Sequence, residues 1–192
     1  MSEVGHRVPF LPAVLRFPKF RSDRRGVAAV EFALIAPILL LILVAMVDFG
    51  LVLYVRFTLN DNLSASSNYA IVSASNVSSS GGSGLATSMV SIIPSTVDMT
   101  VVVNNGPTVT RTSGTSVSSG TASNADSCYC PTVSGTTVTW GSAVTCGGSC
   151  GSSTYAGKFV AVTASVSHTP LFGNYGFVQN GMVTAFTIVQ VQ

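Results

Sequence analysis

The longest apolar run in the chain predicts a membrane-spanning helix near the amino terminus. Residues 32–47 are apolar without a break, and the apolar stretch reaches back to Val27. About 20 apolar residues in a helix cross a bilayer core about 30 Å thick. Counted from Val27, the far interface falls near Val47, so we expect Asp48 at the water boundary. Pro37 lies within the span, where neighbouring helices or waters can satisfy the carbonyl group that it frees.

Beyond the span, the pattern predicts a continuing helix, a linker and a second, shorter helix. Apolar side chains recur at helical spacing as far as about residue 74, at Leu59, Leu63, Tyr69 and Ala70. Residues 78–84 contain only Ser and Gly, a composition typical of a flexible linker. Residues 85–93 can form a short helix that ends before Pro94, because proline disfavours a helical conformation in the residue before it.

The remainder of the chain has the two-residue period of β-strands. Apolar and polar positions alternate over residues 97–103, and a turn signal at residues 104–107 lets residues 108–112 pair back. Residues 160–167 give the clearest half-buried strand, whereas residues 182–191 are apolar on both faces, which predicts a more central strand. Three or four such strands need a cover for their apolar face. The water-exposed half of the long helix is expected to supply it.

Composition and charge exclude several classes of protein. Hydrophobic residues make up 47% of the 192 residues but charged residues only 8%, against about 25% in a typical soluble domain. That composition argues against a cytosolic enzyme with a charged surface, and a net charge of +2 argues against a nucleic-acid binder. Residues 1–26 hold six of the nine basic side chains. Beside a membrane span, this bias predicts a cytoplasmic amino terminus, with the remainder beyond the inner membrane.

All four cysteines lie within residues 113–157, a stretch rich in Ser, Thr and Gly that cannot build a core alone. Outside the cytoplasm, two disulfides are the expected state. Of the three possible connectivities, we favour two bonds that link the pair Cys128 and Cys130 to the pair Cys146 and Cys150. Each bond would close a loop of about 15–20 residues, which stabilises by about 3 kcal/mol. A zinc site is the competing interpretation, but the spacings are C-x-C and C-x3-C, and no His is nearby.

The sequence shows no constellation of residues that could carry catalysis. Its two histidines are His6, in the basic leader, and His168, beside Pro170 at a strand end. Neither a G-x-S-x-G nucleophile elbow nor an H-E-x-x-H metal motif occurs, and the carboxylates are scattered. We therefore expect no enzyme activity, no cofactor, no metal and no small-molecule substrate. An exported enzyme is the least favoured alternative.

Residues 24–32 read R-R-G-V-A-A-V-E-F, and this pattern resembles the site at which prepilin peptidases cut pilins and pseudopilins. In those proteins a Gly precedes the cut, and a Glu is fifth in the mature chain. The segment continues with A-L-I-A-P and then with D-F-G at residues 48–50, and here it resembles the TadE-like family. That family comprises minor pilins or pseudopilins of the tight-adherence (Tad/Flp) pilus machinery. The resemblance extends over residues 24–70. A weaker resemblance, to the two closing strands of the family, covers residues 160–170 and 183–191.

The resemblance implies a structural or assembly component of a Tad-type pilus that a prepilin peptidase cuts after Gly26. The processing site would comprise Arg25, Gly26, Val27, Glu31 and Phe32. Glu31 would then pair with the new α-amine of Val27, in the same chain or in a neighbour. The implied partners are the inner membrane, the prepilin peptidase and other Tad pilins, pseudopilins and pilus assembly proteins. The apolar run is longer than the roughly 7–15 residues of a secretory signal, so we do not expect a conventional signal peptide.

The expected fold is α+β and pilin-like, a lollipop in which a long amino-terminal transmembrane helix extends into a small antiparallel β-sheet domain. The expected regions are a basic cytoplasmic leader (1–26), the membrane helix with its extension (27–75), a linker with a short helix (76–95) and an extracytoplasmic β-rich domain (96–192). The chain would span the bacterial inner membrane once, with its carboxy-terminal domain in the periplasm, on the pilus or at the cell surface. The alternative is an uncleaved single-pass anchor that carries an adhesion or scaffold domain.

Overall fold

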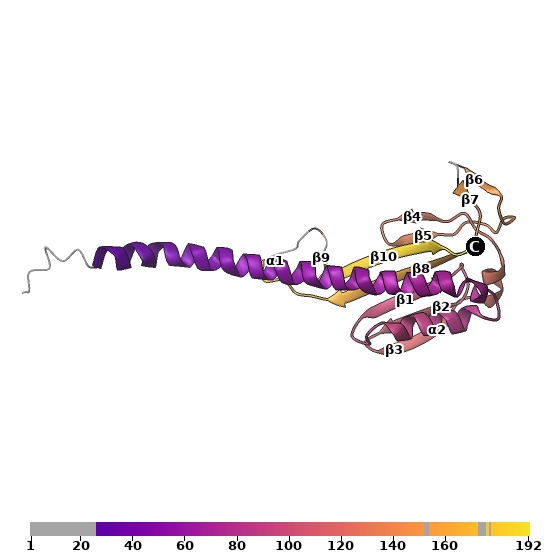
Figure 1. Cartoon of the computed structure of the whole chain (residues 1–192), viewed down its shortest axis with the longest axis horizontal. Coiled ribbons are helices and arrows are strands. Elements are labelled where there is room, and N and C mark those ends of the chain that lie inside the picture. Colours follow the sequence, from indigo (N-terminus) through magenta and orange to yellow (C-terminus); the bar gives the residue numbers. More distant parts are fainter. Residues whose placement is uncertain (1–25, 152–153, 173–175, 177) are drawn as a thin grey trace, which may run out of the picture. The chain divides into compact units, whose positions relative to one another are not determined.

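The computed structural model describes residues 26–151, 154–172, 176 and 178–192. It contains a long apolar helix followed by an antiparallel β-sheet domain, which confirms the α+β expectation (Figure 1). The chain divides into two compact units, residues 1–43 and residues 44–192. Apart from Gly26, the predicted leader lies outside the described residues.

The main helices are α1 (Val27–Val72) and α2 (Gly82–Ile92), and the short 3-10 helices are η2 (Ala74–Asn76) and η3 (Ala122–Asp126). The strands of the main sheet are β1 (Asp98–Val103), β2 (Thr108–Thr112), β3 (Thr115–Ser119), β8 (Phe159–Ser167), β9 (Val178–Gln179) and β10 (Met182–Gln190). These strands are antiparallel and lie in the order β3–β2–β1–β8–β10–β9. Two small sheets are formed by β4 (Thr132–Ser134) with β5 (Thr137–Thr139) and by β6 (Ser149–Gly151) with β7 (Thr154–Tyr155).

Helix α1 is a single helix of 46 residues whose pattern of burial changes at Asp48. None of residues 27–47 is buried. From Asp48 onward one stripe of α1 is buried, at intervals of three, four or seven residues that keep the side chains on one helix face. This stripe comprises Asp48, Val52, Leu59, Leu63, Ser66 and Ala70. The helix ends at Val72, two residues before the predicted end.

Strand β8 lies at the centre of the main sheet because β1 and β10 pair with it along most of its length. The turn between β1 and β2 places Asn104 and Asn105 at positive φ, 51° and 56°, which asparagine tolerates better than most residues. This turn and the hairpin that it joins were both predicted from the sequence.

The prediction that residues 182–191 form the more central strand is wrong. Within the described residues, strand β9 pairs with only Met182 and Val183 of β10, so most of β10 has a neighbouring strand on one side alone. The second half of β10 is only half-buried. The apolar side chains of β10 are therefore buried at some positions and partly exposed at others, and the strand is not enclosed on both faces.

One apolar core joins the buried stripe of α1, helix α2 and the main sheet. Its fully buried side chains include Leu59 of α1, Met89 of α2, Val101 of β1 and Val162 of β8. Burying a side chain of this size stabilises the fold by about 1.5–3 kcal/mol. The extension of the long helix thus contributes to the cover that the strands were expected to need, and α2 supplies the remainder.

Residues 78–84 do not form the flexible linker that their composition predicted. They fold into a turn and the first residues of α2, and Gly82 is buried there. A Cβ on Gly82 would lie 2.9 Å from a ring carbon of Pro107, so any larger residue here would force the ring or the backbone to move. The backbone N–H of Ser79 donates to the carboxylate of Asp126 at 2.8 Å. Packing and hydrogen bonds therefore order a segment whose sequence alone carries no signal of order.

Arg111 is a buried cation that fastens α2 to the sheet. It lies on β2 and is 5% exposed. Its guanidinium donates to four backbone carbonyl groups that surround the end of α2, those of Val90, Ile93, Pro94 and Val97. These acceptors offset the cost of burying the charge, because a buried charged donor needs its hydrogen bonds satisfied.

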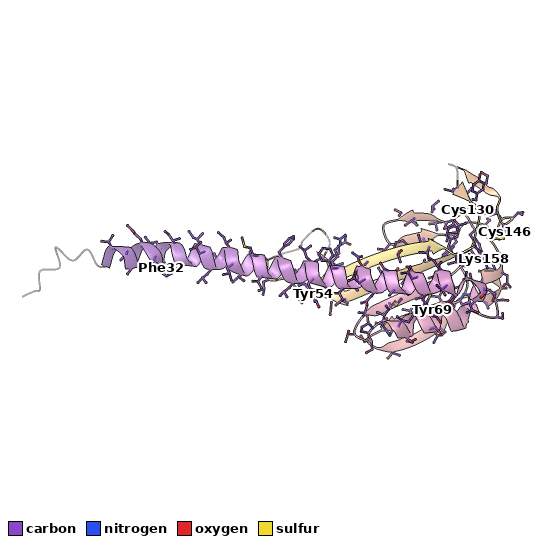
Figure 2. The ribbon with its side chains drawn as sticks, viewed as in Figure 1. Phe32, Tyr54, Tyr69, Cys130, Cys146 and Lys158 are labelled. Atoms are coloured by element: carbon purple, nitrogen blue, oxygen red, sulfur yellow. A yellow bond between two sulfur atoms is a disulfide. The ribbon has the colours of Figure 1, made fainter. Side chains whose placement is uncertain are left out.

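The two disulfides expected in the Ser/Thr/Gly-rich stretch are present, Cys128–Cys146 and Cys130–Cys150 (Figure 2). Their sequence separations are 18 and 20 residues, and each joins one cysteine of the first pair to one of the second. Sulfurs in disulfide bonds are not thiolate ligands, so this arrangement does not leave the C-x-C and C-x3-C spacings available for zinc. Asn104 ties the stretch to the sheet, because its side-chain amide donates to the carbonyl of Ala125 and accepts from the N–H of Phe159.

Candidate functional site

The predicted processing site lies at the start of α1. Gly26 precedes the first helical residue, Val27, and a Cβ on Gly26 would meet no atom within 4 Å beyond its chain neighbours. The side chains of Val27, Glu31 and Phe32 are exposed, that of Phe32 by 68% (Figure 2). Arg25 lies outside the described residues. The bond between Gly26 and Val27 is therefore left uncovered by the described part of the chain.

Glu31 carries the charge closest to this bond among the described residues. It follows Val27 by four residues, so both residues stand on the same face of α1, about 6 Å apart along the helix axis. The Cα–Cβ bonds of a helix tilt toward its amino terminus, so the side chain of Glu31 leaves the helix in the direction of residue 27. The side chain is exposed, and the described residues form no ion pair with it.

The surface of residues 27–47 has the length and composition of a membrane span. An 18-residue window of α1 has a mean hydropathy of 2.8, and none of that window is buried. The 21 residues from Val27 to Val47 rise by about 31 Å. A bilayer core is about 30 Å thick. This candidate membrane helix therefore fits a single-pass membrane protein.

Asp48 makes a contact that sequence reasoning missed. Its side chain is 5% exposed. The N–H of Leu171 donates to both carboxylate oxygens at 3.1 Å, and the N–H of Phe172 donates to Oδ2 at 3.3 Å. The donors lie in the loop that follows β8, 123 and 124 residues further along the chain. Protein N–H groups therefore help to satisfy the carboxylate that was expected to face water.

Two further carboxylates stabilise turns of the β domain. Asp98 accepts from the N–H of Ser113 at 2.8 Å, and Asp126 accepts from the N–H of Ser79 at the same distance. The hydrogen bonds from Ser79 lower the pKa of the Asp126 carboxyl below its ordinary value, and the charge of Lys158 adds a smaller effect in the same direction.

Clustered metal-ligating side chains are not found in the described ranges, where no three His, Cys, Asp or Glu groups could hold one ion. His168 lies at the end of β8, and its backbone N–H donates to the carbonyl of Gly181. The expectation that the chain has no enzyme activity stays a prediction, because these contacts describe structural roles and do not measure catalysis.

Residues 26–65 match the family model described as TadE-like protein. The matched segment begins at Gly26 and ends within α1, so it contains the predicted cleavage bond, the candidate membrane span and Asp48. Neither the curated proteins nor the solved structures gave a match to the chain. The family match supports a component associated with the Tad pilus. It confirms the resemblance drawn from the sequence over residues 26–65, which are similar to the TadE-like family, whereas residues 160–170 and 183–191 lie outside the match.

Proposed function

We propose that this chain is a minor pilin or pseudopilin of a Tad-type pilus system, cut by a prepilin peptidase between Gly26 and Val27. The observation that carries the proposal is the TadE-like match, which begins at Gly26, on a helix whose first 21 residues are unburied. The chain would span the inner membrane once, with the β domain on the periplasmic side. Processing would leave Val27 as the first residue of that helix.

The exposed start of α1 supports the cleavage step. A peptidase must reach the backbone on both sides of the bond, and Gly26 presents no side chain there. Cleavage would create a positively charged α-amine at Val27, one helical turn before Glu31. An ionised carboxylate deep in a bilayer costs about 2.5–3.5 kcal/mol when it has no partner. The new α-amine, from the same chain or from a neighbouring subunit, would offset that cost.

The unburied apolar surface supports the assembly step. In the membrane, lipid covers residues 27–47. In a pilus or pseudopilus, the same side chains would pack against the helices of neighbouring subunits, which keeps them away from water. The β domain, with its two disulfides, would then stand outside the helical core of the assembly.

The cleavage step is tested by expressing the full chain with and without a prepilin peptidase and measuring its intact mass. Wild-type protein should lose residues 1–26 only when the peptidase is present, and Gly26→Val should block that loss. Gly50→Val is the matched control, because Gly50, on α1, likewise has no atom within 4 Å of an added Cβ. An intact amino terminus in the presence of the peptidase would contradict processing. That result would favour the alternative, an uncleaved single-pass anchor that carries an adhesion or scaffold domain.

A further inference from the structure

Two large apolar side chains are exposed side by side in the loop after β8. Leu171 is 75% exposed and Phe172 is 43% exposed. Their backbone N–H groups are the donors to the Asp48 carboxylate. The loop is therefore fixed to α1 through its main chain, while its apolar side chains are left uncovered by the described residues.

Asp48 also marks the place where α1 leaves the predicted membrane core. It is the first buried residue of α1, and it follows a stretch whose length of about 31 Å matches a bilayer core of about 30 Å. The hydrogen bonds from Leu171 and Phe172 hold the loop at this same level of the helix. Exposed apolar side chains at that level meet the boundary between headgroups and acyl chains.

We propose that Leu171 and Phe172 insert into the lipid leaflet on the side of the β domain, so that this domain contacts the membrane at a second point besides α1. Apolar and aromatic side chains bind a bilayer in this way when they enter the boundary by several ångströms. The occupant is lipid because the loop is continuous, through Asp48, with the end of the membrane span. The inference rests on the single-pass insertion of α1 in the proposed function.

The consequence is a fixed orientation of the β domain at the membrane surface. With only α1 inserted, the helix and the domain could tilt from the bilayer normal toward any side. The second contact selects the tilt in which the loop after β8 rests on the bilayer. Extraction of the subunit into an assembly would have to break this contact as well as remove α1 from lipid.

The test uses the full chain in phosphatidylcholine vesicles whose acyl chains are brominated near the headgroup. The native indole is first removed by Trp140→Phe. Phe172→Trp then reports lipid contact through quenching of its fluorescence. Leu41→Trp reports insertion of α1, with bromine placed deeper in the chains, and Val117→Trp reports an exposed apolar site on β3.

We expect quenching of the Phe172→Trp emission by at least about twofold, as for an interfacial anchor, and no quenching of Val117→Trp. Quenching at residue 41 with none at residue 172 would overturn the second contact and leave the membrane span intact. An unquenched residue 41 would contradict the span itself, and with it the proposed function.

A second measurement covers the case in which Phe172→Trp does not fold. Leu171→Cys carries a nitroxide label, which is selective because the four native cysteines are paired in disulfides. We expect the label to be more accessible to oxygen than to a water-soluble nickel complex, with the reverse order for Val117→Cys. The same order at both positions would overturn the proposal.

Discussion

Replacement of Asp48 by Ala should release the loop after β8 from α1 while the main sheet stays folded. The carboxylate is 5% exposed and accepts from the N–H groups of Leu171 and Phe172. A hydrogen bond to a charged group contributes about 1.5–3 kcal/mol, so loss of both donors should cost about 3 kcal/mol or more. Because about 1.4 kcal/mol corresponds to a factor of ten, the open loop should become about 100-fold more populated.

Amide hydrogen exchange of the full chain in lipid nanodiscs measures this change directly. The amides of Leu171 and Phe172 should exchange about 100-fold faster in Asp48→Ala, because local opening exposes them. Asp98→Ala is the matched control, since Asp98 also accepts from a loop N–H, that of Ser113. It should accelerate exchange at Ser113 and leave residues 171 and 172 unchanged. Unaltered exchange at residues 171 and 172 in Asp48→Ala would refute the reasoning.

Three further predictions concern the β domain. Arg111→Leu should lower the free energy of unfolding by about 3 kcal/mol, because it leaves four carbonyl groups without their buried donor. Urea denaturation measures this loss, and a loss below about 1 kcal/mol would contradict the prediction. The pKa of Asp126 is lower in the folded state than its ordinary value of 3.8. The ionised carboxylate therefore stabilises the fold fully at pH values above 3.8, and this stabilisation is lost as the pH falls through the folded-state pKa. Wild-type protein should therefore lose more thermal stability than Asp126→Asn on acidification below about pH 4, and parallel losses would count against this role. The double change Cys128→Ser with Cys146→Ser should lower the free energy of unfolding by about 3 kcal/mol. The midpoint of thermal unfolding measures this loss, and an unchanged midpoint would show that the fold does not depend on this disulfide.

The elements of this fold that depend on local patterns could be predicted from the sequence. The apolar run fixed α1 near its observed bounds, and the alternation over residues 160–167 gave β8 almost residue for residue. The cysteine spacing and the compartment argument were enough for the disulfides. Each of these signals lies within a short stretch of chain, so one sequence contains all of it.

The contacts that escaped prediction join segments far apart in the chain through the backbone. Asp48 meets N–H groups 123 and 124 residues away, and every non-proline residue has such a group, so nothing in the sequence marks the partner. Arg111 likewise binds carbonyl groups, which carry no residue identity. The ordering of residues 78–84 comes from the fit of Gly82 against Pro107, which their composition does not reveal.

The central claim, that this chain is a Tad pilus component in which Glu31 acts after cleavage, is tested most directly by counting pili. The cells compared carry wild-type protein, Glu31→Ala or Asp61→Ala as their only copy of the chain. Asp61 is a matched control because it is an exposed carboxylate on α1 beyond the membrane span. We predict that all three proteins reach the membrane in equal amounts and that only Glu31→Ala cells lose most of their pili. Normal pilus numbers on Glu31→Ala cells would contradict the account.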